Sequence, residues 1–360
     1  MQKSISEKFI LILSQRDISH PAAGGAEKYL HKAISVLAEK EKIIHLGCAF
    51  DGCKKEEIID GVQYVRHGKN LFTVIFYGIK FYLHNRRQVL MVIDHSNTHQ
   101  FFTFLWVRKK RVFFIHQLAL DIWPYYFGKI GNIFWVLEEL LIRLSRGRAI
   151  TVSESTKNDL ASRKFKEIYV VPEGNDIVCH ELPSDESKQD YLLYVGRMVP
   201  YKRVEDAILV AAKLEKKLII IGRGPKKYTD FLKVYAEKVQ ADCEFLGFIS
   251  KEEKTQRMKD AYLLLMPSIR EGWGLVITES SNLGTPSVVY NVNGVIEAVN
   301  YGKAGYIAKN MSVEGMLEVI RDITPEGYKK IREDAFDYSL KFTWEQTAQI
   351  FADTIHSILQ

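Results

Sequence analysis

The sequence predicts an α/β protein built from two doubly wound domains, each with a parallel sheet covered by helices on both faces. The chain has 360 residues, which is more than one average domain. Short apolar runs alternate with segments whose apolar residues recur at helical spacing, and this alternation is typical of parallel βαβ units. The alternation stops once, over about residues 172–190, and then begins again.

The first half begins with a buried strand at 9–14, FILILS, and continues with a helix over 26–40. Further strands are predicted at 43–50, 62–68, 89–95, 110–117 and 149–155, and further helices at about 71–84 and 130–146. Residues 172–190 are polar and contain two prolines, which is the composition of a linker.

The second half repeats the same order of elements. Strands are predicted at 191–196, 217–222, 243–248, 261–268 and 285–291, with helices from about 203, 225, 251 and 274 and a last helix over about 344–358. Ligands of doubly wound sheets bind beyond the carboxyl ends of the strands. Two such domains therefore predict a ligand cleft between them.

The composition excludes several classes of protein. Hydrophobic residues make up 47% and charged residues 26% of the chain, which excludes a disordered or collagen-like protein. The four cysteines form no CxxC pair, so neither a disulfide framework nor a zinc site is indicated. No apolar run approaches the ~18 residues of a spanning helix, and the amino-terminal run is too short for a signal peptide. We expect a cytoplasmic protein.

The net charge of +6 is unevenly distributed along the chain. Residues 1–180 hold 26 Lys and Arg against 18 Asp and Glu, whereas the remainder holds 24 against 26. A basic first half fits an acidic ligand or a membrane surface, and it equally fits an ordinary basic surface.

Glycines and cations stand where predicted strands end or helices begin. Gly24 and Gly25 precede a helix, whose free N–H groups attract anions. The Gly222-Arg-Gly224 turn follows the strand KLIII. Arg197 and Lys202 follow the strand YLLYV and suit a diphosphate, since Arg offers a planar fork and Lys a point charge. Each feature alone also fits a plain turn or surface charge.

The segment from Pro267 to Glu279 is the most specific of these features. Glu271 lies at the carboxyl edge of the strand AYLLLMPS, and Glu279 lies eight positions further on in the following helix. A carboxylate accepts paired hydrogen bonds from a vicinal diol, so these two residues suit a sugar and a ribose. The N–H groups of Trp273, Gly274 and Leu275 are expected to face the same anion.

Several further residues carry weaker signals. His116 ends the strand RVFFIH at the carboxyl edge of the first sheet, and His95 and His99 are weaker candidates. Ser153 lacks a G-x-S-x-G elbow, so we interpret it as a polar lining or a helix cap. The sequence has no Asp-x-Asp, no Walker loop and no HExxH. No metal site is therefore predicted.

Taken together, these motifs resemble the retaining GT-B glycosyltransferases of family four, the group 1 glycosyl transferases, over nearly the whole chain. The matching motifs, in order, are Gly24-Gly25-Ala-Glu, Gly-Arg197-(x4)-Lys202, Gly222-Arg-Gly224, Gly247-Phe248 and Glu271-(x7)-Glu279. The resemblance implies a GT-B fold, with two Rossmann-like domains facing an interdomain cleft. It implies an acceptor-side domain over 1–175, a linker over 176–190, a nucleotide-sugar domain over 191–340, and a helix over 341–360 that crosses back to the first domain.

The resemblance also implies roles for individual residues. The backbone around Gly25 is expected to meet the donor, and Arg197 and Lys202 to neutralise its diphosphate. Glu279 is expected to bind the ribose and Glu271 the transferred sugar. His116 is then a contact near the reacting bond, and the donor site is completed by a set of residues from the second half: Gly222, Gly247, Phe248, Trp273, Gly274 and Leu275.

The implied reaction moves a hexose from a UDP- or GDP-linked donor, without cofactor or metal. Fixed cations would stabilise the charge on the leaving diphosphate. Because the resemblance assigns Glu271 to hydroxyl binding and not to nucleophilic attack, we expect a front-face displacement that retains configuration.

The sequence departs from the family pattern at three places. It has Glu173-Gly174-Asn175-Asp176 where the family often has Asn-Gly-Val-Asp, and Arg203 where glycine often follows the lysine. It has Asn293-Gly294-Val-Ile-Glu297 where Gly-Gly often precedes Pro-Glu, which affects sugar recognition.

Three other functions compete with glycosyl transfer. A nucleotide-sugar epimerase has the same architecture, and a non-catalytic module would bind the nucleotide sugar without turnover. An NAD-dependent oxidoreductase needs a GxGxxG turn, which is absent.

No motif identifies the acceptor, which we expect to be a saccharide or a lipid-linked molecule. Aromatic residues over 101–106 and 123–127 flank the basic cluster at 108–111, which fits contact with a membrane or equally a buried core beside a solvated strand entry. No motif supports nucleic-acid binding.

Overall fold

The computed structural model describes residues 7–97, 99–108, 110–185 and 188–360. The chain forms two compact units, and neither is a continuous segment. Unit 1 contains Met1–Leu118, Val136–Gly174 and Trp344–Gln360, and unit 2 contains Ala119–Trp135 and Asn175–Thr343.

Unit 1 is built around an eight-stranded sheet. Its strands are β1 (Phe9–Leu13), β2 (Ile43–Gly47), β3 (Glu56–Ile59), β4 (Val62–Arg66), β5 (Val89–Ser96), β6 (Arg111–Ile115), β7 (Arg148–Thr151) and β8 (Glu167–Val170). The order is β3-β4-β2-β1-β5-β6-β7-β8, and every pairing is parallel except β3 with β4. The central strand β1 is buried at every position, because helices cover both faces of the sheet.

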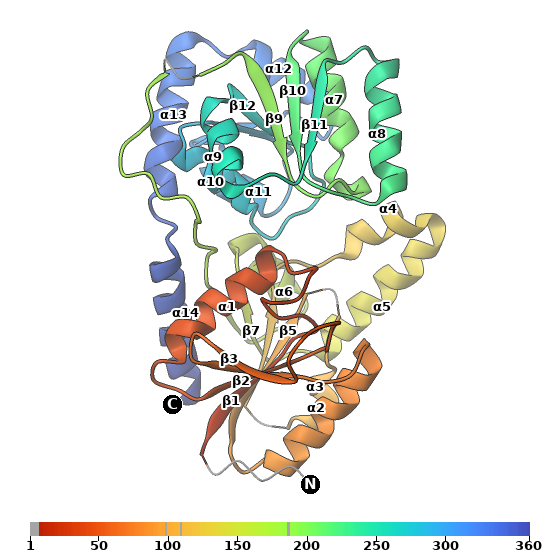
Figure 1. Cartoon of the computed structure of the whole chain (residues 1–360), viewed down its shortest axis with the longest axis vertical. Helices are drawn as coiled ribbons and strands as arrows, with labels where there is room; N and C mark the ends of the chain where they lie inside the picture. The colour runs from red at the N-terminus through yellow and green to blue at the C-terminus, as the bar shows by residue number, and fades with distance from the viewer. Residues whose placement is uncertain (1–6, 98, 109, 186–187) are drawn as a thin grey trace. The chain divides into compact units, whose positions relative to one another are not determined.

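The helices of unit 1 connect these strands. They are α1 (Gly25–Leu37), α2 (Leu71–Asn85), α3 (Thr103–Trp106), α6 (Glu154–Ser162), α14 (Trp344–Leu359) and the second half of α5 (Gly131–Leu144). Figure 1 shows α1 and α14 side by side, and their contact includes the rings of Tyr29 and Trp344, whose centroids are 6.1 Å apart. The last helix of the chain therefore completes the first unit.

Unit 2 has a fully parallel, six-stranded sheet. Its strands are β9 (Tyr191–Val195), β10 (Lys217–Ile221), β11 (Cys243–Gly247), β12 (Leu263–Met266), β13 (Ser287–Val289) and β14 (Tyr306–Ile307), in the order β11-β10-β9-β12-β13-β14. The chain moves outward from β9 to β11 and then returns to pair β12 with β9. The strand order therefore reverses between β9 and β12, which is where doubly wound sheets bind ligands.

The helices of unit 2 surround this sheet. The main ones are α7 (Val204–Lys213), α8 (Lys226–Lys238), α9 (Lys251–Asp260), α10 (Leu275–Asn282), α11 (Val295–Ala298), α12 (Val313–Arg321) and α13 (Pro325–Ser339). The short elements η1 (Leu120–Ile122), α4 (Trp123–Phe127) and η2 (Gly128–Ile130) also belong to unit 2, where Ile122 packs against Val199 and Tyr201.

Two doubly wound α/β units confirm the predicted fold class. Within the described ranges, no helix is long and apolar enough to cross a bilayer.

Candidate functional site

The carboxyl ends of β9 and β12 bring several of the predicted residues of unit 2 to one place. Arg197 lies two residues after β9, is exposed, and donates from Nη2 to the hydroxyl of Tyr201 at 2.9 Å. The hydroxyl of Tyr194 donates to the backbone carbonyl of Arg197, which holds the turn that follows β9. The guanidinium is thus oriented at the point where the strand order reverses.

Lys202 and Glu271 form an ion pair across this point. Lys202 ends the turn η4 (Pro200–Lys202) after β9, and Glu271 follows β12. Lys202 Nζ donates to Glu271 Oε1, and both side chains are only 10% exposed. The sequence predicted both residues at this edge but predicted neither their pairing nor the burial of Lys202.

The glycines after β10 allow two backbone segments to cross closely. A Cβ atom on Gly222, whose φ is +142°, would lie 1.8 Å from the carbonyl oxygen of Gly196. A Cβ on Gly224 would lie 2.0 Å from the carbonyl oxygen of Met198. Only glycine fits these contacts, so the Gly-Arg-Gly sequence has a packing reason independent of any ligand.

The loop from Glu271 to α10 is also held by a glycine. A Cβ on Gly294, whose φ is +86°, would lie 2.3 Å from the carbonyl oxygen of Glu271. Gly294 therefore lets the segment after β13 support the segment that carries Glu271. Gly274, with φ of +96°, is the N-cap of α10, and Trp273 beside it is 4% exposed.

Glu279 lies within α10 and is 6% exposed. Its Oε2 accepts from Lys254 Nζ of α9 at 2.8 Å, a contact that the sequence did not suggest. Leu275, at the start of α10, is half-buried. Each predicted carboxylate of unit 2 is therefore buried and paired with one lysine.

Gly247 and Phe248 lie at an open edge after β11. A Cβ on Gly247 would meet nothing within 4 Å, and Phe248 is 74% exposed. The guanidinium carbon of Arg223 lies 5.0 Å from the centre of the Phe248 ring. An exposed aromatic ring beside a cation offers a stacking surface for a planar group.

In unit 1, the predicted glycine pair opens α1. Gly24 is the N-cap and its N–H donates to Glu27 Oε2 at 2.7 Å. Arg16 Nε donates to the other oxygen of Glu27 at 2.9 Å, and Arg16 also donates to the carbonyl of Ala22 at 3.1 Å. Arg16 and Glu27 thus hold the loop that ends in Gly24 and Gly25.

His116 lies among buried partners at the carboxyl edge of the unit 1 sheet. Its Nδ1 lies 2.9 Å from Glu173 Oε1, and its Nε2 lies 3.1 Å from Nε2 of His95. Nδ1 of His95 lies 2.9 Å from the hydroxyl of Ser14. Both imidazole nitrogens of His116 are therefore engaged within unit 1, and Glu173 was not among the predicted site residues.

Burial sets the protonation of groups beside His116. It is the main cause that lowers the pKa of His95 well below its usual value, and the neighbouring His116 adds to this effect. Burial, followed by the charge of Glu173, raises the pKa of Tyr29 well above its usual value. His95 is therefore neutral and Tyr29 is protonated at neutral pH.

Ser153, one of the weaker candidates, has a structural role. Ser153 is the N-cap of α6 and accepts from the backbone of Thr156, which confirms its interpretation as a cap. His99 is exposed. Phe101, from the aromatic segment beside the basic cluster, is completely buried.

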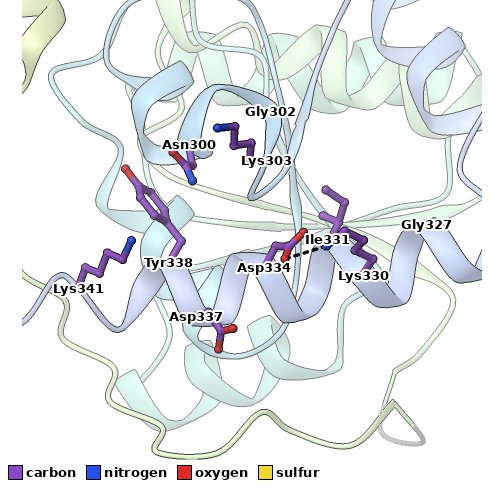
Figure 2. A pocket seen from close by; sticks show the side chains of 10 residues that line it. All are labelled: Asn300, Gly302, Lys303, Gly327, Lys330, Ile331, Asp334, Asp337, Tyr338 and Lys341. Atoms are coloured by element: carbon purple, nitrogen blue, oxygen red, sulfur yellow. Dashed lines mark hydrogen bonds and ion pairs between the residues drawn. The ribbon is translucent and has the colours of Figure 1, made fainter.

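Figure 2 shows a hollow in unit 2 lined by α13 and the turn η5 (Asn300–Gly302). An ion pair between Lys330 and Asp334 lies along it, and Lys303 and Lys341 also contribute to its lining. None of its lining residues directly follows a strand, so it is separate from the residues at the ends of β9 and β12. Among the described residues, no group of three His, Cys, Asp or Glu side chains is placed to hold a metal ion.

Comparisons with known families match each half of the chain. Residues 23–178 match the model described as Glycosyltransferase Family 4, and residues 182–338 match the model described as Glycosyl transferases group 1.

Individual relatives match the chain at low sequence identity and over only part of its length. The chain is 28% identical, over 55% of its length, to an uncharacterized glycosyltransferase of Methanocaldococcus jannaschii, and 30% identical, over 62% of its length, to a glycogen synthase of Mycobacterium tuberculosis. These alignments span 56% and 58% of the two relatives, a little over half of their lengths.

Solved structures share the fold at low identity. A sucrose-phosphate synthase from Thermosynechococcus elongatus gives a TM-score of 0.79 at 16% identity, covering 98% of this chain and 99% of that one. The Anabaena protein HepE, solved with UDP and glucose, gives a TM-score of 0.73 at 16% identity, covering 98% and 100%. The GT-B fold of the chain is thereby established.

Proposed function

We propose that this chain, a group 1 glycosyltransferase by its family matches, transfers a hexose from a nucleotide-diphosphate sugar to an acceptor hydroxyl with retention of configuration. The observation that carries the proposal is the convergence of Arg197, Lys202 and Glu271 at the switch point between β9 and β12. A diphosphate needs cations there, and a sugar needs an acceptor of hydroxyl protons.

In this proposal the diphosphate of the donor binds beside Arg197 and Lys202. Arg197 is exposed and already oriented by Tyr201, so its guanidinium is available to phosphate oxygens. Lys202 is buried against Glu271, which holds the ammonium at a fixed place. Cations that need no rearrangement stabilise the charge that develops on the leaving diphosphate.

The two carboxylates bind the sugar and the ribose. Glu271 uses Oε1 for Lys202, and Glu279 uses Oε2 for Lys254. The other oxygen of each carboxylate has no hydrogen bond to the described residues, and it is assigned to a donor hydroxyl. The exposed ring of Phe248, with Arg223 beside it, is assigned to the base, uridine or guanosine.

The chemical step is a front-face displacement. The bond between the anomeric carbon and the diphosphate oxygen breaks, the acceptor oxygen bonds to the same face of that carbon, and the leaving phosphate oxygen takes the acceptor's proton. Glu271 acts in hydroxyl binding and not as a nucleophile. We propose that the reaction is metal-independent, because Arg197 and Lys202 supply the positive charge.

The first experiment is a thermal-shift screen of UDP- and GDP-sugars, followed by a transfer assay with product NMR. A donor that binds the folded state raises the melting temperature, and the product should have the anomeric configuration of the donor. Arg197→Ala should abolish the shift, while Arg321→Ala, at an exposed site on α12, should not. An epimerised donor without transfer, an inverted product, or binding without turnover would each contradict the proposal.

We propose further that the acceptor is lipid-linked and is met at a membrane surface. The observation that favours a membrane is the exposed stripe of α2: Phe72 is 82%, Phe76 is 72% and Leu83 is 55% exposed. These residues and the exposed Lys80 follow helical spacing along one side of α2, and the exposed Arg87 lies two residues beyond its end. α3 packs beside α2, since the rings of Tyr82 and Trp106 are 5.3 Å apart, and it adds Leu105, 75% exposed (Figure 1).

The charge around this stripe is one-sided. Residues 67–110 contain seven Lys and Arg but a single acidic residue, Asp94, which is 1% exposed. Arg66, just before this range, is buried and paired with Asp17 and Glu57, so it does not contribute. Exposed apolar rings beside uncompensated cations fit an anionic lipid surface, where the rings enter the interface and the cations meet the headgroups.

Vesicle flotation tests this part of the proposal. The chain should bind vesicles of phosphatidylcholine with 30% phosphatidylglycerol, and Phe72→Ser with Phe76→Ser should remove the binding. Val234→Ser, at a 64% exposed position of α8 in unit 2, is the matched control and should bind as the wild type does. Equal binding by both variants, or a monomer–dimer change in the α2 variant instead, would contradict the membrane assignment.

A further inference from the structure

A continuous chain of hydrogen bonds runs through the carboxyl edge of the unit 1 sheet. It links Glu173, His116, His95 and Ser14 in that order, at 2.9, 3.1 and 2.9 Å. Ser14 then donates to the carbonyl of Arg16 at 3.0 Å. All four residues are at most 8% exposed, so their hydrogen bonds are largely shielded from water.

The number of available protons fixes which atom donates in each of these hydrogen bonds. A hydroxyl has one proton, and Ser14 gives its proton to Arg16, so Nδ1 of His95 must be the donor to Ser14. His95 is neutral because burial lowers its pKa, so its single N–H is on Nδ1 and its Nε2 is a bare acceptor. The contact between the two Nε2 atoms therefore needs a proton on His116.

The last contact then needs one more proton. With Nε2 of His116 protonated, the 2.9 Å contact between its Nδ1 and Glu173 Oε1 is a hydrogen bond only if a proton lies between these two atoms. The pair is either imidazolium with carboxylate or imidazole with carboxylic acid, and in both cases its net charge is zero. A hydrophobic side chain in place of Glu173 could not supply this arrangement, because it has no proton to place between itself and Nδ1 of His116.

We propose that Glu173 is a positioning residue that shares a proton with His116 and thereby holds His95, Ser14 and the Gly24–Gly25 turn in one arrangement. The turn is reached through Arg16, whose backbone is held by Ser14 and whose side chain holds Glu27 and Ala22. Glu27 in turn accepts from Gly24. The effect on catalysis rests on the proposed function, whereas the proton arrangement does not.

The other groups that contact these hydrogen-bonded side chains do not provide an alternative donor to Nδ1 of His116. The ring of Tyr29 meets His116 edge-on with centroids 5.1 Å apart, but the Tyr29 hydroxyl donates to the carbonyl of Val171. Thr156 from α6 donates to the backbone carbonyl of His116 and not to its ring. The charges that act on His95 from further away are those of His45 and Arg16.

The test is the 15N spectrum of the imidazoles in the full chain at pH 7.5, assigned with His95→Asn and His116→Asn. The wild type should show His95 protonated on Nδ1 alone and His116 protonated on Nε2. The amide N–H of Glu173→Gln can donate to Nδ1 of His116, so this conservative variant should keep the wild-type arrangement. Glu173→Met carries no proton to share, because its sulfur can only accept weakly. His95 should then move its proton to Nε2, and Ser14 should turn toward His95 and release Arg16.

Exchange of the amides of Gly24 and Gly25 gives a second readout. Release of Arg16 should speed their exchange about five-fold in Glu173→Met, the size expected for one hydrogen bond. Ser14→Ala should give the same increase, and the double variant should add nothing. Asp60→Asn is the matched control, because it changes the carboxylate partner of another buried histidine of unit 1, His31, and should leave His95 unchanged.

Kinetics then separate the two proposals. If the chain is a glycosyltransferase, Glu173→Met should lower kcat with little change in donor KM, because the donor-binding residues of unit 2 are intact. Finding Nε2–H on His95 in the wild type overturns the inference even if no variant folds. An unchanged His95 tautomer in folded Glu173→Met also overturns it. Absence of any transfer activity alongside the expected spectra overturns only the proposed function.

Discussion

The buried pair of Lys202 and Glu271 gives a prediction that separates its structural and chemical roles. Lys202→Met leaves a carboxylate that is about nine-tenths buried without its partner, and Glu271→Gln leaves a buried ammonium. Removing one member of a buried pair costs about 3–5 kcal/mol, whereas replacing both with neutral groups is often nearly neutral. Each single variant should therefore lose about 3 kcal/mol or more, and the double variant much less.

Urea unfolding followed by circular dichroism measures this cycle, with hydrogen exchange of β9 and β12 assigning the transition to unit 2. A loss of 3 kcal/mol corresponds to a fall of about 6–12 °C in melting temperature for a unit of this size. The Lys226–Asp230 pair of α8 is the control, since its side chains are 89% and 54% exposed and its coupling should be about 0.3–0.5 kcal/mol. A coupling between Lys202 and Glu271 no larger than that of the control would refute the argument from burial.

Four further predictions follow from the same structure. Arg197→Ala should lower turnover about 10²–10³-fold with an unchanged melting temperature, because the side chain is exposed; near-normal turnover would remove its assignment to the diphosphate. Glu279→Ala should raise donor KM more than it lowers kcat, because the ribose is remote from the reacting bond, and steady-state kinetics showing the reverse would contradict that role. EDTA should leave transfer activity intact, and loss of activity restored by manganese would show that Arg197 and Lys202 do not suffice. Burial lowers the pKa of Lys188 to about 7 from its usual 10.5, so the unfolded chain binds more protons there between these values. The melting temperature of the wild type relative to Lys188→Met should therefore rise from pH 7 to pH 10, and a fall would have the wrong sign.

The sequence predicted the central strands well because burial on both faces requires continuous apolar runs. β1 and β12 are buried at every position, and their sequences FILIL and LLLM contain only apolar residues. The edge strands β3 and β8 were missed, because their residues are exposed or half-buried and EEII and EIYV contain at most three consecutive apolar residues. The short helix α4 was missed as well, since none of its five residues is buried.

The candidate site was predictable where chemistry and spacing lie close together in the sequence. Arg197 and Lys202 were found because both follow one strand within a few residues. The pairing of Lys202 with Glu271 and of Glu279 with Lys254 depends on which strands and helices become neighbours, and local sequence does not contain that information. Glu173 was noted only as a departure from the family pattern, and that departure was the signal that could have found it.

The return of α14 to unit 1 has a consequence for synthesis on the ribosome. About 170 residues, Asn175–Thr343, are made after Gly174 and before α14 begins. At translation rates of roughly 5–20 residues per second, this interval lasts about 8–34 s. During that time α14 does not yet cover the side of unit 1 on which it later packs, which includes Tyr29 and Phe114. Unit 2 can finish folding first, although it starts later, and the nascent first sheet is a natural client for a chaperone until the last helix emerges.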